Sequence, residues 1–170
     1  MKKILFLLAA GLLSATSVAA QSVTDLDTKY GFRDLKFETD TSAIEGLALS
    51  EQKSFRLLAE RPDDSRKVGK ATLNKIEYGF FQGKLYEVTL VTKGLVNSKA
   101  LREALESQFG EGTLVSAAGQ NRNWVGKRVR LTYREDPAFH NATVQFTHIQ
   151  LAQELAKAEK SVKKSGGGDL

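Results

Sequence analysis

Two stretches near the middle of the chain alternate between apolar and polar residues at every second position, which is the period of a β-strand. They run over residues 71–81 and 84–93, and the dipeptide Gln82-Gly83 between them favours a two-residue hairpin turn. The alternation therefore predicts an antiparallel hairpin with one face towards the core and the other towards water. The residues expected on the core face are Ile76, Tyr78, Phe80, Tyr86, Val88 and Leu90.

The segment after this hairpin has the period of an amphipathic helix, because its apolar residues recur at spacings of three and four. The helix is predicted to start at Asn97 or Ser98, either of which can cap it, and to end at Phe109 before Gly110. A loop rich in glycine, serine and asparagine is expected to follow. The apolar positions of the helix are Leu101, Ala104, Leu105 and Phe109.

Strand-like alternation returns in residues 128–134 and 142–148, and each segment is predicted to be a further strand. The chain then regains helical spacing over residues 150–164 and ends in a glycine-rich tail that we expect to be disordered. The part before the hairpin has weaker patterns. It predicts a strand at 32–39, a helical turn at 42–46, short strands at 47–49 and 55–59, and an exposed loop at 61–70.

These elements together predict an α+β fold with a single curved antiparallel β-sheet, packed on one face by the helix. The expected order is hairpin, helix and then two or three strands, all within residues 21–149. Residues 150–170 add the C-terminal helix and the tail. The predicted core between sheet and helix consists of Ile76, Tyr78, Val88, Leu90, Leu101, Leu105, Val129, Leu131, Val144 and Phe146.

The first twenty residues have the three-part layout of a cleaved signal peptide. Two lysines are followed by an apolar run over residues 4–13, and small residues then lead to Ala20. The apolar run is too short to span a bilayer, which needs about 20 residues. We therefore expect cleavage after Ala20, a mature chain without a transmembrane segment, and a periplasmic or secreted location.

Composition narrows the possible functions only a little. The chain has no cysteine, which excludes disulfides, thiol catalysis, thiolate metal sites and a lipid-modified cysteine. The absence of cysteine and the Met-Lys-Lys start fit a bacterial periplasm. The net charge of +5 is mild and argues against nucleic-acid binding, which requires a concentrated basic surface.

A row of arginines is the most distinctive candidate for a binding site. Because strand side chains alternate, Arg128, Arg130 and Arg134 should project together from the face opposite the core residues of residues 128–134. Arginine matches carboxylate and phosphate geometry, and a neighbouring indole adds a stacking surface. The alternative is a solvated face neutralised by Glu77 and Glu87 from the hairpin. The full candidate binding set is Arg122, Trp124, Lys127, Arg128, Arg130 and Arg134.

Two further features of the sequence are candidates for function. The aromatic residues Phe81 and Trp124 fall outside the core pattern and could form an exposed recognition pair. The chain also has two histidines, His140 in a predicted loop and His148 at the end of a predicted strand, which could form a metal or acid–base site with Glu135 or Asp136. Their spacing does not supply the three or four converging ligands that a metal requires, so no metal, cofactor or catalytic residue is assigned.

Several short motifs resemble a family of small, exported, uncharacterised bacterial proteins. The residues concerned are Tyr78-Gly79-Phe80-Phe81, Gly83-Lys84-Leu85, Gln108-Phe109-Gly110, Trp124 and the strand from Val129 to Tyr133. The resemblance covers about residues 30–148 and implies the fold and export only, because these motifs carry no catalytic function.

From the sequence we favour a non-enzymatic, exported binding or interaction module. Its expected ligand is an anionic glycan, a lipid headgroup or an acidic protein partner, held by the basic sheet face. The alternative interpretation is a small hydrolase or metal-dependent enzyme centred on His140 and His148.

Overall fold

The computed structural model describes residues 25–53 and 55–165. The expected signal peptide and the glycine-rich tail therefore lie outside the described residues. Within the described part, no helix has the length and apolarity needed to cross a membrane.

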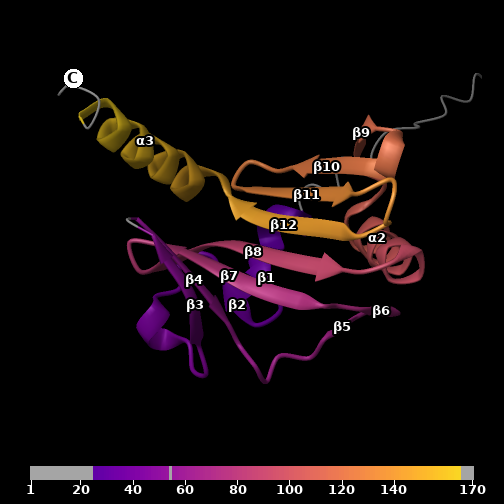
Figure 1. Ribbon diagram of the computed structural model, residues 1–170, viewed down its shortest axis with the longest axis horizontal. Coiled ribbons are helices and arrows are strands. Elements are labelled where there is room, and N and C mark those ends of the chain that lie inside the picture. The colour runs from indigo at the N-terminus through magenta and orange to yellow at the C-terminus, as the bar shows by residue number, and fades with distance from the viewer. Residues whose placement is uncertain (1–24, 54, 166–170) are drawn as a thin grey trace, which may run out of the picture.

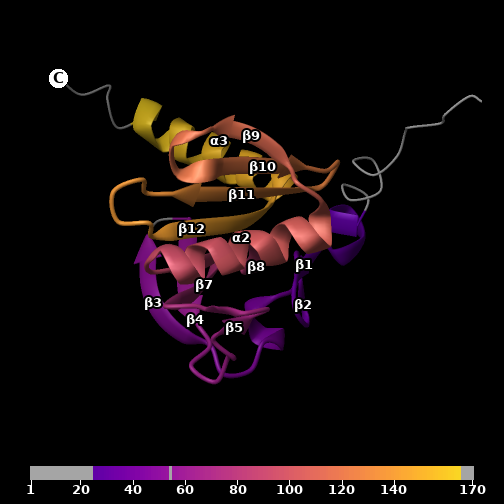
Figure 2. The same ribbon diagram turned by 90° about the vertical axis from the view of Figure 1, so that its right-hand side faces the viewer.

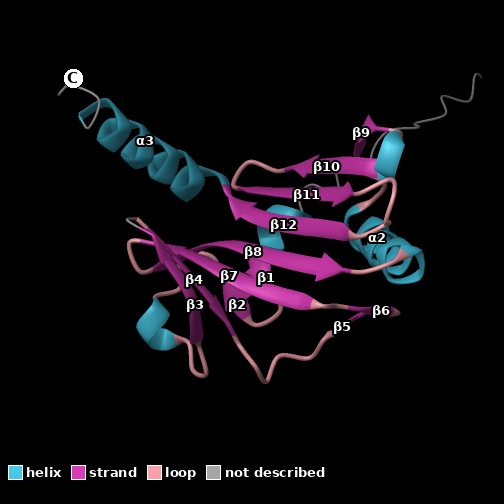
Figure 3. Cartoon of the chain, in the orientation of Figure 1, coloured by secondary structure: helices cyan, strands magenta, loops and turns pink. Residues whose placement is uncertain are grey.

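One eight-stranded antiparallel sheet dominates the fold (Figures 1 and 3). Its spatial order is β3-β4-β7-β8-β12-β11-β10-β9, so two four-stranded meanders meet where β8 pairs with β12. The predicted α+β class with a large antiparallel sheet is confirmed. The strands are β3 (Ala48–Lys53), β4 (Arg56–Glu60), β7 (Lys75–Phe81), β8 (Lys84–Thr92), β9 (Thr113–Ser116), β10 (Asn121–Val125), β11 (Val129–Glu135) and β12 (Ala142–His148).

Smaller elements surround this sheet. Residues 25–29 are helical and lead into the two-stranded hairpin of β1 (Gly31–Phe32) and β2 (Leu35–Lys36). A second small hairpin, β5 (Lys67–Val68) and β6 (Ala71–Thr72), precedes β7. The helices are η1 (Thr41–Ala43), α2 (Leu95–Phe109), η2 (Ala118–Gln120) and α3 (Ile149–Ser165).

The main core lies on the face of the sheet that α2 covers (Figure 2). All ten residues that the sequence predicts for the core are buried and belong to this one cluster. The N-terminal segment contributes Phe32, Leu35 and Phe37 to the same cluster, so it shares this inner face with α2. Helix and N-terminal segment together shield a face that would otherwise expose a row of aliphatic and aromatic side chains.

The opposite, outer face carries a smaller cluster beneath α3. Successive strand residues point to opposite faces, so Phe80 belongs to the main core while Phe81 packs under Leu151 and Leu155 of α3. A register shift between Gly79 and Phe80 also moves Tyr86 out of the expected core face. The prediction for Tyr86 was therefore wrong, because a bulge reverses the parity of the strand at that point.

Several other predictions differ from the structure, two of them in the number of strands. The strand expected at 32–39 is a pair of two-residue strands, because the chain turns at Arg33, which has a positive φ of 56°. The segment expected as a loop after α2 contains β9 and β10, so four strands follow the helix. The apolar alternation is lost in β10 because Arg122, which pairs with the core-facing Tyr133, occupies one of its inward positions.

Candidate functional site

The outer face of β11 carries two of the six predicted binding residues. Arg130 and Arg134 are exposed, while Val129, Leu131 and Tyr133 are buried, which confirms the predicted alternation. The strand order, however, places β12 between β8 and β11. The hairpin acids are therefore not cross-strand neighbours of these arginines, since Arg130 faces Thr147 of β12 in the ladder.

Arg122 and Trp124 lie on the inner face of β10. Arg122 is paired in the ladder with the core-facing Tyr133, and its Nε lies 2.8 Å from Oε1 of Glu106 on α2. Trp124 is 2 % exposed and donates from Nε1 to the carbonyl oxygen of Gly110 at 2.8 Å. Phe81 is equally buried, so the expectation of an exposed aromatic recognition pair was wrong.

The last two predicted residues, Lys127 and Arg128, lie in the turn between β10 and β11. The carboxylate of Asp27 accepts their backbone N–H groups at 2.6 and 2.9 Å and also that of Val129. Burial raises the pKa of Asp27, but these three hydrogen bonds together bring the pKa below its ordinary value. The Arg128 guanidinium lies 3.9 Å from the centre of the Tyr30 ring. The predicted set is thus divided among three places.

The two histidines lie at opposite ends of β12. Eight residues separate them, which corresponds to roughly 25 Å along an extended strand. His140 Nδ1 lies 2.8 Å from Oε1 of Glu135, whereas His148 contacts Tyr30. Within the described ranges, no three histidine, cysteine or acidic residues are close enough to hold a metal ion. The structure therefore does not assemble the shared histidine site of the alternative interpretation.

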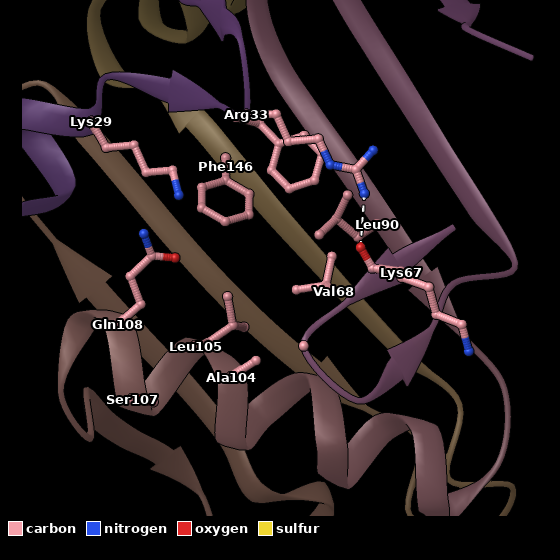
Figure 4. A pocket seen from close by; sticks show the side chains of 12 residues that line it. Lys29, Arg33, Lys67, Val68, Leu90, Ala104, Leu105, Ser107, Gln108 and Phe146 are labelled. Carbon is pink, nitrogen blue, oxygen red and sulfur yellow. Dashed lines mark hydrogen bonds between the residues drawn. The ribbon is translucent and has the colours of Figure 1, made fainter. Parts of the chain in front are cut away.

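A pocket of about 440 Å³ lies between α2, the N-terminal segment and the β5–β6 hairpin (Figure 4). Its apolar surface comes from segments far apart in sequence. Leu90 and Phe146 belong to the central strands β8 and β12, Ala104 and Leu105 to α2, and Val68 to the small hairpin. This volume falls within the usual range for small-ligand pockets.

Basic and neutral polar groups stand at the two ends of this apolar surface. Lys29 and Gln108 approach the cavity from one end, and Arg33 and the main chain of Lys67 lie at the other (Figure 4). None of the described residues that line the pocket is acidic. Lining groups of this kind favour an anion over a cation.

Arg33 is already engaged in holding the pocket wall. Its guanidinium donates to the carbonyl oxygens of Ser65 and Lys67 at 2.6 and 3.0 Å, and it lies 4.0 Å from the carboxylate of Asp64. The Lys67 ammonium donates to Thr72 Oγ1 at 2.6 Å. The Arg33 contacts tie the N-terminal segment to residues 64–67, and the Lys67 contact lies within the β5–β6 hairpin. Both cationic groups are therefore already engaged by the protein.

Lys29 differs from both of these residues. Its Nζ lies 5.8 Å from the centre of the Phe109 ring and makes no ion pair with any residue in the described part of the chain. Burial, followed by the charge of Lys36, lowers the pKa of Lys29 below its ordinary value. An anionic group beside Nζ would neutralise this partly desolvated ammonium.

Sequence reasoning missed this pocket because its lining comes from five separate segments, and no one of them contains a motif. Comparison with known proteins adds no functional assignment: no family model, curated protein or solved structure matches the chain significantly. The functional argument therefore rests on the geometry of the chain itself.

Proposed function

We propose that this protein is a non-enzymatic, exported binding protein that holds a small amphipathic anion in the pocket beneath α2. The observation that carries the proposal is an apolar surface with an ammonium at its end and no acidic lining residue among those described. The anionic group of the ligand would lie at Lys29, and its hydrocarbon or aromatic body would cover Phe146 and Leu105. A carboxylate with an acyl chain has this chemistry.

Two physical terms support such a ligand. Each Å² of apolar surface that ligand and pocket remove from water contributes about 25 cal/mol, before the cost of association is subtracted. The charge contributes a second, salt-dependent term, since Lys29 is only half-buried. A neutral ligand of the same shape would keep the first term and lose the second.

Export remains part of the proposal and is supported by the signal-like pattern of residues 2–20. Binding of an anionic glycan, lipid headgroup or acidic partner at the outer face would now depend on Arg130 and Arg134. The pocket is the better-supported site, because the residues expected to strengthen that face lie elsewhere in the fold.

The test compares decanoate with decanol, which share a chain and differ in charge. Isothermal titration calorimetry should detect decanoate binding, and Lys29→Gln should weaken it about tenfold, equivalent to about 1.4 kcal/mol. The same substitution should change decanol binding by less than twofold. Lys93→Gln, at an exposed lysine outside the pocket, is the matched control and should leave both affinities unchanged.

A second variant separates the pocket from the surface. Ala104→Phe places a ring in the cavity and should abolish binding of both probes, while retention of the circular dichroism spectrum shows that the fold persists. Decanoate binding that survives Ala104→Phe would place the ligand elsewhere. Absence of decanoate binding to the wild-type protein would refute an acyl carboxylate as the ligand.

A further inference from the structure

His148 connects the last strand of the sheet to the last helix. It is the final residue of β12, it directly precedes α3, and it is 5 % exposed. Its Nδ1 accepts the backbone N–H of Leu151 at 3.1 Å. Leu151 is the third residue of α3, so this contact is the hydrogen bond of a helix N-cap, made here by an imidazole.

The other ring nitrogen continues the chain of hydrogen bonds. Nε2 lies 2.7 Å from the hydroxyl of Tyr30, which in turn contacts the carboxylate of Glu38. Because Nδ1 accepts a hydrogen bond, the neutral ring carries its proton on Nε2 and donates to Tyr30. Tyr30 then donates to Glu38. Only the hydrogen bond that Nδ1 accepts from Leu151 requires a neutral imidazole, because Nε2 donates to Tyr30 in both protonation states.

We propose that His148 is a pH-operated cap that holds α3 on the sheet and releases it when the imidazole takes up a second proton. The proton binds Nδ1 and converts it from an acceptor into a donor, which removes the bond to Leu151. It also places a positive charge at the N-terminus of α3, where the helix dipole disfavours cations.

The small docking contact of α3 makes this element suited to release. Its buried apolar residues are Leu151 and Leu155, which pack on Phe81 and Tyr86 of the outer face. The side chains of residues 159–163 are exposed, and the helix extends away from the sheet (Figure 1). The cap therefore lies at the only docked end of the described helix, and losing it loosens the contact directly.

The charges around the ring set the direction of the pH effect. Burial lowers the pKa of His148, the carboxylates of Glu38 and Glu154 act in the opposite sense, and Arg128 lowers it again. Lys127 lines a second, separate pocket together with His148 and Tyr30, and it adds positive charge there. The net result is a pKa below the ordinary histidine value of about 6.5. Docking is consequently complete above that pH and weakens as the pH falls.

Hydrogen exchange of individual backbone amides tests the proposal. After correction for the intrinsic rates, protection of residues 151–158 should fall at least tenfold between pH 7.5 and pH 5, while protection of α2 stays constant. His148→Asn supplies an amide oxygen that caps at either pH, so its α3 should remain protected throughout. His140→Asn, the matched control, should retain the wild-type pH response.

The wild-type protein provides a second measurement that does not depend on a variant folding. Nuclear magnetic resonance titration of the His148 ring should show the Nε2–H tautomer at pH 7.5, and its protonation should coincide with loss of α3 protection. Constant α3 protection through the titration would overturn the proposal. A pH response that persists in His148→Asn would overturn it too.

Discussion

The two core leucines of α2 offer a comparison in which the same substitution should have two different costs. Leu101 and Leu105 lie about one turn apart, and they are 0 % and 3 % exposed. Leu105 lines the pocket, whereas Leu101 does not. Truncation to alanine removes three methylene equivalents from each site, which accounts for about 2.4 kcal/mol at about 0.8 kcal/mol per group.

The difference comes from the space left behind. Leu101→Ala creates a closed cavity, so a cavity term is added and the expected loss is about 3–5 kcal/mol. Leu105→Ala only enlarges an existing pocket that water can enter, so its loss of unfolding free energy should be about 2–3 kcal/mol. Guanidinium unfolding monitored by circular dichroism measures both values. Equal costs, or a larger cost at Leu105, would refute the assignment of Leu105 to the pocket wall.

Three further predictions concern other parts of the fold. Gly112→Ala should lower the melting temperature, because Gly112 has a φ of +68° and an added Cβ would lie 2.4 Å from Trp124 Cε2. An unchanged melting temperature would contradict this contact. Asp27→Asn should flatten the loss of stability below about pH 4. A carboxyl whose pKa is lowered by folding stabilises the folded state at pH values above its pKa in the unfolded chain, and this stabilisation is lost when the carboxyl is protonated. Acid unfolding curves of both proteins check the sign. Arg130→Gln, at an exposed position, should change the free energy of unfolding by no more than a few tenths of a kcal/mol, and a larger loss would reveal a structural role.

Local patterns predicted the elements that have strong periodicity. The sequence places a strand at 142–148, and β12 has those bounds. It also predicts the end of α2 at Phe109, where Gly110 follows with a φ of 75°. The helix α2 starts earlier than expected, at Leu95 after Gly94, and the Ser98 N–H donates to the carbonyl oxygen of Gly94. Ser98 is buried and its hydroxyl donates to the carbonyl oxygen of His140, so it does not cap the helix.

Predictions failed where a partner far away in the sequence changes the face of the sheet on which a residue lies. The sequence predicts that Arg122 belongs to a surface row, but Glu106 of α2 allows it to face inward. The sequence predicts that Trp124 is exposed beside basic residues, but its indole lies in the core, where the Gly110 carbonyl oxygen accepts the indole N–H. A polar residue at an inward position interrupts the apolar alternation from which a strand is predicted. Only the fold reveals the partner that makes the buried position acceptable.

For β11, β12 and α2, local periodicity was enough to predict which side chains face inward. That information is local, because strand and helix periods assign Leu131 and Arg130 to opposite faces without reference to any other segment. Strand order, the bulge at Tyr86 and the pocket depend on contacts between residues far apart in the chain. Lys29, Leu105 and Phe146 share a cavity only because folding brings their segments together, and no short-range pattern encodes that juxtaposition.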